Sequence, residues 1–312
     1  MANELVLITG TAHPEMGKRI AKNLNTELRQ VDVSRFSDGE IQIKIEENIR
    51  GTDVFIIQPT MPPAENILEL LLLIDAVRRA SSRRVTAVIP FFGYARQDRK
   101  DQPRVPIGAK LMADLIANAG ADRVLTIDLH APQIQGFFNI PLDHIYSAPV
   151  LLSHFVGKPK DNLAVVAPDV GSIKMARAFA KRLECSLAII DKRRPRPNEA
   201  VVMNFIGDVE GRDVVIFDDM IDTAGTLTDA ARVCVEVHGA LSVTACCTHP
   251  LFSGQALQRI NDSPITEVVV SNTIPFDRFD ECPKIKVLDM APLLADAIGR
   301  IHLEKTVSAL FV

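Results

Sequence analysis

The sequence predicts an α/β protein of two domains, each with a mainly parallel sheet flanked by helices. Short apolar runs, each long enough for one buried strand, alternate along the chain with segments of helical spacing. The length of 312 residues exceeds one ordinary domain and suits two. With 5% aromatic residues and no Trp, packing has to rely on Ile, Val, Leu and Ala, as in strands buried on both faces.

The first half of the chain keeps this alternation up to a proline-marked region near residues 141–149. Apolar runs predict buried strands at 5–9, 54–58, 85–90 and 124–128, and helical spacing predicts helices at 64–80 and 107–119. The segment IQIKI at 41–45 is different, because it alternates strictly between apolar and polar residues. That pattern predicts a strand with one face in water, in an antiparallel flap.

The second half resumes the same rhythm. It predicts strands at 163–169, 187–191, 214–219, 243–248 and 267–272, and helices at 172–184, 226–238 and 290–304. We therefore expect domains 1–147 and 148–312, and leave open that the last helix packs back on the first domain. VLTIDLHAPQIQG and VVIFDDMIDTAGT both run from an apolar strand into acid and then a polar turn, which suggests two related halves.

Charge and cysteine content exclude several classes of protein. Lys and Arg number 35 against 39 Asp and Glu, a net charge of −4, which does not suit binding to nucleic acid or a membrane surface. No signal-peptide pattern occurs and no uncharged run reaches the roughly 18 residues of a membrane span, so we expect a cytoplasmic protein. Five cysteines without a CxxC pair fit a reducing compartment. Adjacent Cys246 and Cys247 invite a metal interpretation, but neighbours on a strand point to opposite faces, which favours packing.

The segment VVIFDDMIDTAGTL, residues 214–227, carries the clearest chemical signal. An apolar strand stops at Asp218 and Asp219, and strand ends in such sheets face the ligand crevice. Paired carboxylates there can accept hydrogen bonds from the vicinal hydroxyls of a sugar or hold a metal ion through water. The alternative is a solvated turn in which Asp222 or Thr226 caps the next helix.

The residues that follow are suited to a phosphate group. Backbone N–H groups and the dipole of a helix beginning near residue 226 favour an anion, and two hydroxyl groups can add contacts. Glycine lets the backbone approach the ligand closely. The candidate residues are Asp222, Thr223, Ala224, Gly225 and Thr226.

A cationic segment, DKRRPRPN at 191–198, follows another apolar run. Its four positive charges lie within five residues, at Lys192, Arg193, Arg194 and Arg196, and its prolines forbid a helix. Such a loop can close over a polyphosphate and release it. A solvated charge run, or a docking segment for nucleic acid or a proline-binding partner, is the alternative.

Several motifs together resemble one family. VVIFDDMIDTAGT resembles the phosphoribosyl diphosphate signature of type I phosphoribosyltransferases. FSDGE (36–40), GYARQDRK (93–100), DLHAPQIQGFF (128–138) and DKRRPRPN resemble the motifs of ribose-phosphate diphosphokinases, and the similarity covers essentially the whole chain. Among these, the chain resembles the bacterial, phosphate-activated type.

This resemblance implies two type I phosphoribosyltransferase-like domains, the first for nucleotide and oligomer contacts and the second for ribose 5-phosphate. It implies transfer of the diphosphoryl group of ATP to the 1-hydroxyl of ribose 5-phosphate, with release of AMP and with Mg²⁺ as the metal. The product serves nucleotide, His and Trp biosynthesis. It also implies a homo-oligomer, usually a hexamer of dimers, whose ATP site is shared between subunits, and regulation by phosphate and ADP through stretches such as 48–51 and 308–311.

The residue roles implied by the resemblance fall into five groups. Lys192 and Arg194 form the catalytic pair, and Arg194 also contacts ribose 5-phosphate. Asp218 and Asp219 meet the ribose hydroxyls, and residues 222–226 hold the 5-phosphate. His130 and Asp169 contact magnesium. The ATP contacts are Phe36, Asp38, Gly39, Glu40, Arg96 and Gln97. The diphosphate loop is Asp169, Val170, Gly171 and Ser172.

The chain departs from the family at one position in that loop. The family usually has two consecutive glycines, and here Ser172 follows Gly171. If the backbone at residue 172 required a positive φ, serine would be strained there.

The motifs leave two other classes of protein to consider. One is a non-catalytic relative, and the other is a phosphoribosyltransferase that acts on a base, with or without a role in transcription. The intact cationic, SDGE and RQD motifs favour the kinase-type enzyme over both.

Overall fold

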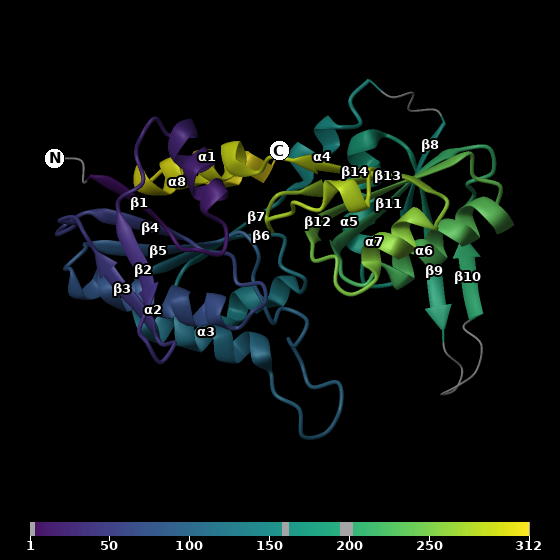
Figure 1. Cartoon of the computed structure of the whole chain (residues 1–312). Helices are drawn as coiled ribbons and strands as arrows, with labels where there is room; N and C mark the ends of the chain where they lie inside the picture. Colours follow the sequence, from purple (N-terminus) through teal and green to yellow (C-terminus); the bar gives the residue numbers. More distant parts are fainter. Residues whose placement is uncertain (1–3, 158–161, 194–201, 312) are drawn as a thin grey trace. The chain divides into compact units, whose positions relative to one another are not determined.

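The structure, a computed structural model, describes residues 4–157, 162–193 and 202–311 and divides into two compact units (Figure 1). Unit 1 contains the chain up to Tyr146, together with Thr273–Pro275 and the residues from Met290 onward. Unit 2 contains Ser147–Asn272 and Phe276–Asp289. The sequence had assigned residues 290–312 to the second domain while allowing the last helix to pack on the first; the structure groups this helix with unit 1.

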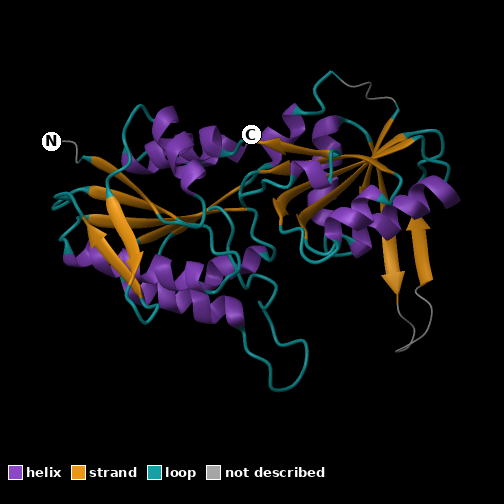
Figure 2. Cartoon of the chain, in the orientation of Figure 1, coloured by secondary structure: helices purple, strands orange, loops and turns teal. Residues whose placement is uncertain are grey.

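Unit 1 is built on a five-stranded parallel sheet in the order β1-β4-β5-β6-β7 (Figure 2). Its strands are β1 (Leu5–Thr9), β4 (Asp53–Ile57), β5 (Arg84–Ile89), β6 (Arg123–Ile127) and β7 (Leu142–Ile145). β2 (Val31–Arg35) and β3 (Ile41–Ile45) form a separate antiparallel hairpin, which confirms the predicted flap. All five residues of β4 are buried, because helices cover both faces of the sheet.

Helices pack on the two faces of this sheet. α1 (Pro14–Asn23) and α8 (Ala291–His302) contact each other on one face, and α2 (Glu65–Arg79) and α3 (Gly108–Ala119) contact each other on the other. Short 3₁₀ turns follow at Pro132–Phe137 and Ser308–Phe311. α3 ends where Gly120 adopts a left-handed φ of 114°, a conformation that glycine enters without the steric cost of a Cβ atom.

Unit 2 contains a seven-stranded sheet in the order β10-β9-β8-β11-β12-β13-β14, parallel except for the edge strand β10. Its strands are β8 (Leu163–Ala167), β9 (Ser186–Arg193), β10 (Val202–Ile206), β11 (Asp213–Ile221), β12 (Ser242–Pro250), β13 (Ile265–Ser271) and β14 (Ile285–Leu288). α4 (Ala148–Ser153) and α5 (Ile173–Leu183) contact each other, as do α6 (Gly225–Arg232) and α7 (Ala256–Asn261). A π-helical turn at Val233–Val237 follows α6, and a 3₁₀ turn lies at Phe279–Glu281.

The connections of unit 2 create a topological switch point. After β8 the chain moves to β9 and β10 on one side, and then returns to β11 on the opposite side of β8. A crevice therefore opens beyond the carboxyl ends of β8 and β11, the place where open α/β sheets bind ligands. The segments that follow these two strands carry Asp169 and the sequence from Asp218 to Thr226.

The predicted elements differ from the observed ones mainly at their ends. β11 does not stop at its two acids but continues through Met220 to Ile221, because its ladder with β12 extends to Pro250. β9 extends to Arg193, because β10 pairs with it, so Lys192 lies in a strand. The helix expected over 226–238 divides into α6 and the π-helical turn. In the described part of the chain, no helix is long and apolar enough to cross a membrane.

One glycine of unit 1 is required by a close backbone approach. A Cβ atom at Gly93 would lie 2.2 Å from the carbonyl oxygen of Thr60, and the N–H of Gly93 donates to Oγ1 of Thr60 at 2.7 Å.

We expect Gly93→Ala to lower the free energy of unfolding by about 1–3 kcal/mol through this overlap. Chemical denaturation measures the change. Gly136→Ala is the control, since its Cβ meets no atom within 4 Å, and equal effects of the two substitutions would contradict the assignment.

Candidate functional site

Two adjacent carboxylates lie near the carboxyl end of β11. Asp219 is 6% exposed, and its N–H donates to Oδ1 of Asp218 at 2.9 Å. Asp218 is paired in register with Cys247 of β12, so its position in the sheet is fixed by the ladder rather than by a loop. The sheet therefore presents two acidic groups at the switch point on a rigid support.

The electrostatics of this position are unfavourable for a second negative charge. Burial raises the pKa of Asp218 well above its usual value, and the nearby charges of Asp219 and Asp169 raise it further. Like charges brought together in a partly desolvated place disfavour ionisation. A cation, or hydroxyl groups that donate hydrogen bonds, would relieve this repulsion, so the site is suited to a ligand that supplies either.

The loop after β11 turns sharply into α6. Ala224, immediately before the helix, has a left-handed backbone with φ 60° and ψ 6°, and its carbonyl accepts a hydrogen bond from Oγ1 of Thr228 at 3.0 Å. Backbone N–H groups in the first turn of a helix have no intrahelical acceptor and carry the positive end of its dipole. Thr223 and Thr226 are exposed beside them. The arrangement can hold a phosphate group.

The sequence predicts that Gly225 lets the backbone approach a ligand closely; the left-handed conformation of this loop lies at the preceding residue, Ala224. Gly225 is not in the left-handed region, and a Cβ atom there would lie 3.8 Å from Nη1 of Arg259, an ordinary contact. The nearby Arg259 was not identified from the sequence. It lies on α7, and its Nη1 donates to the carbonyl oxygen of Thr223 at 2.8 Å.

The segment after β8 forms a second turn at the switch point. The N–H of Ser172 donates to Oδ1 of Asp169 at 2.9 Å, and its hydroxyl donates to the carbonyl of Asp169 at 3.1 Å. Ser172 has φ −83° and precedes α5, so serine is not strained here. Val170 and Gly171 are both exposed, and a Cβ atom at Gly171 would lie 3.2 Å from Oδ1 of Asp169. Serine in place of the usual glycine is therefore compatible with this backbone.

The corresponding crevice of unit 1 is filled by the protein itself. After β1, the N–H and the hydroxyl of Thr11 both donate to the buried carboxylate of Glu69 at 2.5 Å, and the N–H of Ala12 donates to Oε1 of Gln58 at 3.2 Å. A Cβ atom at Gly10 would lie 2.4 Å from that Gln58 oxygen. Side chains of the protein thus occupy the place that an anion could take in this loop.

The FSDGE motif forms the tip of the β2–β3 hairpin. The N–H of Phe36 donates to the carbonyl of Glu40 at 2.9 Å, and Gly39 closes the turn with φ 96°. Phe36 is 50% exposed, and Asp38 and Glu40 are exposed with it. The hairpin presents an aromatic ring and two carboxylates away from its own unit.

The YARQD motif follows β5 in the same unit. Arg96 and Gln97 are both exposed, and a Cβ atom at Gly108 would lie 2.5 Å from Oε1 of Gln97. Gln97 therefore packs against the first turn of α3. Its N–H donates to the carbonyl of Tyr94 at 2.9 Å, which shapes the turn that carries Arg96.

The two candidate metal ligands lie in different units. His130 is exposed after β6 in unit 1, and Asp169 follows β8 in unit 2. Over residues 4–157, 162–193 and 202–311, no group of three or more His, Cys, Asp and Glu side chains is arranged to hold a metal ion. Oxygen donors are nevertheless present at the switch point, and they are the ligands that Mg²⁺ prefers, usually with water and substrate phosphates completing its shell.

The proposed cationic residues are described only in part. Lys192 lies in β9, in register with Met203 of β10. Arg194 and Arg196 lie outside the described residues. β9 and β10 pair antiparallel and form one edge of the unit 2 sheet (Figure 1).

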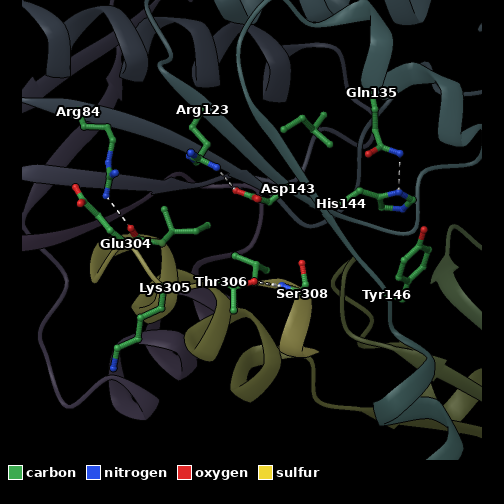
Figure 3. Close-up of a pocket in the computed structure, with 13 residues that line it drawn as sticks. Arg84, Arg123, Gln135, Asp143, His144, Tyr146, Glu304, Lys305, Thr306 and Ser308 are labelled. Carbon is green, nitrogen blue, oxygen red and sulfur yellow. Dashed lines mark hydrogen bonds and ion pairs between the residues drawn. The ribbon is translucent and has the colours of Figure 1, made fainter. Parts of the chain in front are cut away.

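Unit 1 also contains a pocket of about 720 Å³ (Figure 3). Basic and acidic side chains line it together: Arg123 donates to Asp143 at 2.6 Å, and Lys305 and Glu304 come from the segment after α8. The N–H of Leu129 donates to Nε2 of His144 at 2.9 Å, and Nδ1 of the same ring lies 3.3 Å from Nε2 of Gln135. The remaining lining residues are Arg84, Leu142, Tyr146, Ile301, Thr306, Val307 and Ser308.

A buried ion pair supports one wall of this pocket. Asp53 is 2% exposed and binds Arg84 through both carboxylate oxygens, at 2.8 and 2.5 Å. Nδ1 of His302, at the end of α8, lies 2.8 Å from the same carboxylate. The hydrogen bond to Asp53 raises the pKa of the Arg84 guanidinium. This network fastens the start of the C-terminal segment to β4 and β5.

The fold, with acidic residues at its switch point, defines an α/β protein of the phosphoribosyltransferase type. Comparisons with known proteins identify the family within this class. Residues 5–120 match the N-terminal domain of ribose phosphate pyrophosphokinase, and residues 192–312 match the phosphoribosyl synthetase-associated domain. The chain belongs to the ribose-phosphate pyrophosphokinase family, which makes 5-phosphoribosyl 1-diphosphate from ATP and ribose 5-phosphate for nucleotide biosynthesis.

Individual relatives match over nearly their full length. Ribose-phosphate pyrophosphokinase of Clostridium perfringens is 52% identical over 99% of this chain and 98% of the relative. The enzyme of that name from Ralstonia nicotianae is 54% identical over 98% of both. The crystal structure of phosphoribosylpyrophosphate synthetase from Mycobacterium smegmatis superposes with a TM-score of 0.91 and 38% identity, covering 96% of this chain and 99% of that one. The predicted family and fold class are thereby confirmed.

The repulsion at Asp218 leads to a prediction about stability. Because folding raises the pKa of Asp218, its ionisation in the folded state costs stability, and this cost appears as the pH rises through the folded-state pKa. We expect Asp218→Asn to stabilise the ligand-free protein by on the order of 1 kcal/mol at about pH 8, and by less at about pH 5.

Thermal unfolding followed by circular dichroism at the two pH values measures this difference. Asp280→Asn, at an exposed position of unit 2, is the matched control. A variant at Asp218 that is less stable than the parent at the higher pH would contradict the assigned repulsion.

Proposed function

We propose that the switch point of unit 2 is the ribose 5-phosphate site of this enzyme. One observation carries the proposal: two carboxylates on β11 are followed directly by a left-handed turn and a helix N-terminus. Asp218 and Asp219 accept hydrogen bonds from the ribose hydroxyls. The 5-phosphate lies on residues 222–226, where N–H groups and the helix dipole favour an anion.

Mg²⁺ is the divalent ion we propose for an enzyme family that uses ATP. The fit rests on the carboxylates of Asp218, Asp219 and Asp169, whose mutual repulsion raises the pKa of Asp218. Asp169 and His130 are its candidate protein contacts, in units 2 and 1 respectively. When bound, the ion neutralises charge on the transferring diphosphoryl group. The turn from Asp169 through Val170 and Gly171 to Ser172 binds the diphosphate.

ATP binding is proposed for the FSDGE hairpin and the YARQD turn of unit 1. Phe36 packs against the adenine, and Asp38 and Glu40, with Gly39 between them, accept from its exocyclic amine. Arg96 binds phosphate and Gln97 adds a polar contact. The half-exposed ring of Phe36 supports a site shared with a neighbouring subunit in a homo-oligomer, for which we propose a hexamer of dimers.

Catalysis in this scheme is positioning plus cationic stabilisation. The 1-hydroxyl oxygen of the sugar attacks the β-phosphorus of ATP, the bond from this phosphorus to the oxygen that bridges to the α-phosphorus breaks, and AMP leaves. Negative charge develops on the transferred oxygens and on that bridging oxygen. We assign Lys192 and Arg194 to stabilise it, with Arg194 also contacting the sugar phosphate.

Turnover tests this assignment. The protein mixed with ATP, ribose 5-phosphate, Mg²⁺ and phosphate should release AMP, and Lys192→Ala should lower kcat by roughly 1000-fold with ATP affinity largely retained, because the cation acts on charge that develops in the transition state. AMP detection and ATP calorimetry give the two quantities. Folded protein that never forms AMP would defeat the proposed reaction, and loss of ATP affinity with unchanged kcat would reassign Lys192 to substrate binding.

Phosphate and ADP are proposed as regulators that bind the unit 1 pocket. Its volume of about 720 Å³ lies within the range of small-ligand sites, and Arg84, Arg123 and Lys305 supply positive charge. Ser308 belongs to the C-terminal stretch that resembles the family's regulatory region, whereas residues 48–51 are not among the lining residues. Tyr146 adds an aromatic face for a base.

A pair of glutamines on one 3₁₀ turn provides a matched test. Gln135 lines the pocket, whereas Gln133 donates to Asp98 at 2.6 Å and is not among the lining residues. We expect Gln135→Ala to raise the ADP concentration for half-inhibition about tenfold, as for the loss of one good polar contact, relative to Gln133→Ala. Titration of AMP formation with ADP gives the values, and equal shifts in both variants would place ADP elsewhere.

A further inference from the structure

The carbonyl groups around the sugar-phosphate loop, residues 222–226, are held from one neighbouring segment. Three consecutive carbonyls, of Ile221, Asp222 and Thr223, accept hydrogen bonds from the stretch between β12 and α7 and from α7 itself. The donors are the N–H groups of Leu251 (3.0 Å) and Phe252 (3.0 Å) to Ile221, the N–H of Ser253 (2.9 Å) to Asp222, and Nη1 of Arg259 (2.8 Å) to Thr223.

The direction of these carbonyls fixes the direction of the N–H groups that follow. In a trans peptide the C=O and the N–H of the next residue point to opposite sides. The N–H groups of Asp222, Thr223 and Ala224 are therefore directed away from the β12–α7 segment. Two of these peptides are held by backbone donors, and the third, between Thr223 and Ala224, is held by the side chain of Arg259.

This third peptide is also the one with a reason to rotate. Ala224 has φ 60°, a conformation that disfavours any residue with a Cβ atom. Rotation of the 223–224 peptide by half a turn changes ψ of Thr223 and φ of Ala224 together, as between type I and type II turns. It would bring φ of Ala224 to about −120° and leave ψ at 6°, near the bridge region, which has a negative φ. The relaxed loop would direct the carbonyl of Thr223, not the N–H of Ala224, toward a bound phosphate.

The guanidinium of Arg259 lies beside the start of a helix other than its own. Arg259 belongs to the last turn of α7, where a cation is favourable for the helix dipole. Its Nη1, however, lies 3.8 Å from the position of a Cβ atom at Gly225, beside the first turn of α6, where a cation opposes the positive end of that dipole. The carbonyl of Thr223 that it binds, or an anion that binds nearby, offsets this second effect.

We propose that Arg259 is a positioning residue of the ribose 5-phosphate site. Its hydrogen bond to Thr223 holds the 223–224 peptide in the orientation that presents the N–H of Ala224 to the 5-phosphate, against the preference of Ala224 for a negative φ. The inference rests on the proposed function, since it takes residues 222–226 as the phosphate site.

A double-mutant cycle tests this role. We expect Arg259→Met to weaken ribose 5-phosphate binding, measured by calorimetry on the full-length protein, by about 10- to 100-fold. In the Ala224→Gly background a positive φ carries no strain. There, the loss of affinity caused by Arg259→Met should be at least about fivefold smaller than in the parent protein. A residue that acted only through overall stability would give the same penalty in both backgrounds.

Three outcomes would overturn the proposal. One is a penalty below about twofold for Arg259→Met, and another is an equal penalty in both backgrounds. If the penalty is equal in both backgrounds and also becomes smaller with added salt, Arg259 acts on the phosphate by charge alone. The third is an equal penalty for Arg232→Met, the control at an exposed arginine at the far end of α6.

Asp219→Asn separates failure of this inference from failure of the proposed site. If Asp219→Asn weakens ribose 5-phosphate binding and Arg259→Met does not, only the role of Arg259 is wrong. If neither substitution changes the affinity, ribose 5-phosphate binds elsewhere and both proposals fall. ATP affinity and the unfolding temperature of Arg259→Met should remain close to the parent values, because Arg259 is exposed and contacts the loop rather than the core.

Discussion

The repulsion between carboxylates at the switch point of unit 2 is the constraint on which the site depends. Asp218 lies in the ladder of β11 with β12, and Asp219 follows it in the same strand, so these two carboxylates cannot separate without disturbing the sheet, whereas Asp169 lies in the turn after the neighbouring strand β8. The folded chain holds these charges together at a cost in stability. Such a cost is common where a protein is organised for a ligand rather than for its own stability.

The loop after β11 shows the same organisation in its backbone. Ala224 remains in an unfavourable conformation because the hydrogen bonds of three preceding carbonyls are satisfied from one side. The N–H groups are thereby preorganised before a ligand arrives, and preorganised donors stabilise an anion without having to reorient when it binds. In the proposed site, the rigid strand would bind the hydroxyls of the pentose and the held loop its phosphate.

Apolar runs, acid pairs and turn residues were enough to predict the parallel sheets, the antiparallel flap and the acidic strand end. The ends of β9 and β11 could not be predicted, because pairing with β10 and β12 extends them through polar residues. Short strands such as β7 and β14, and β10 at the edge, carry too little pattern in four or five residues. Arg259 and Glu69 act through contacts distant in sequence, which no local motif records. Ser172 is not strained, because it immediately precedes α5 and has a negative φ of −83°.

Glu69 satisfies a loop of unit 1 from within the protein. Its carboxylate accepts hydrogen bonds from the N–H and the hydroxyl of Thr11, after β1, in the way that a bound oxyanion would. Because this acceptor is covalently part of the chain, its local concentration is fixed. The conformation of the loop should therefore not depend on the concentration of anions in the medium.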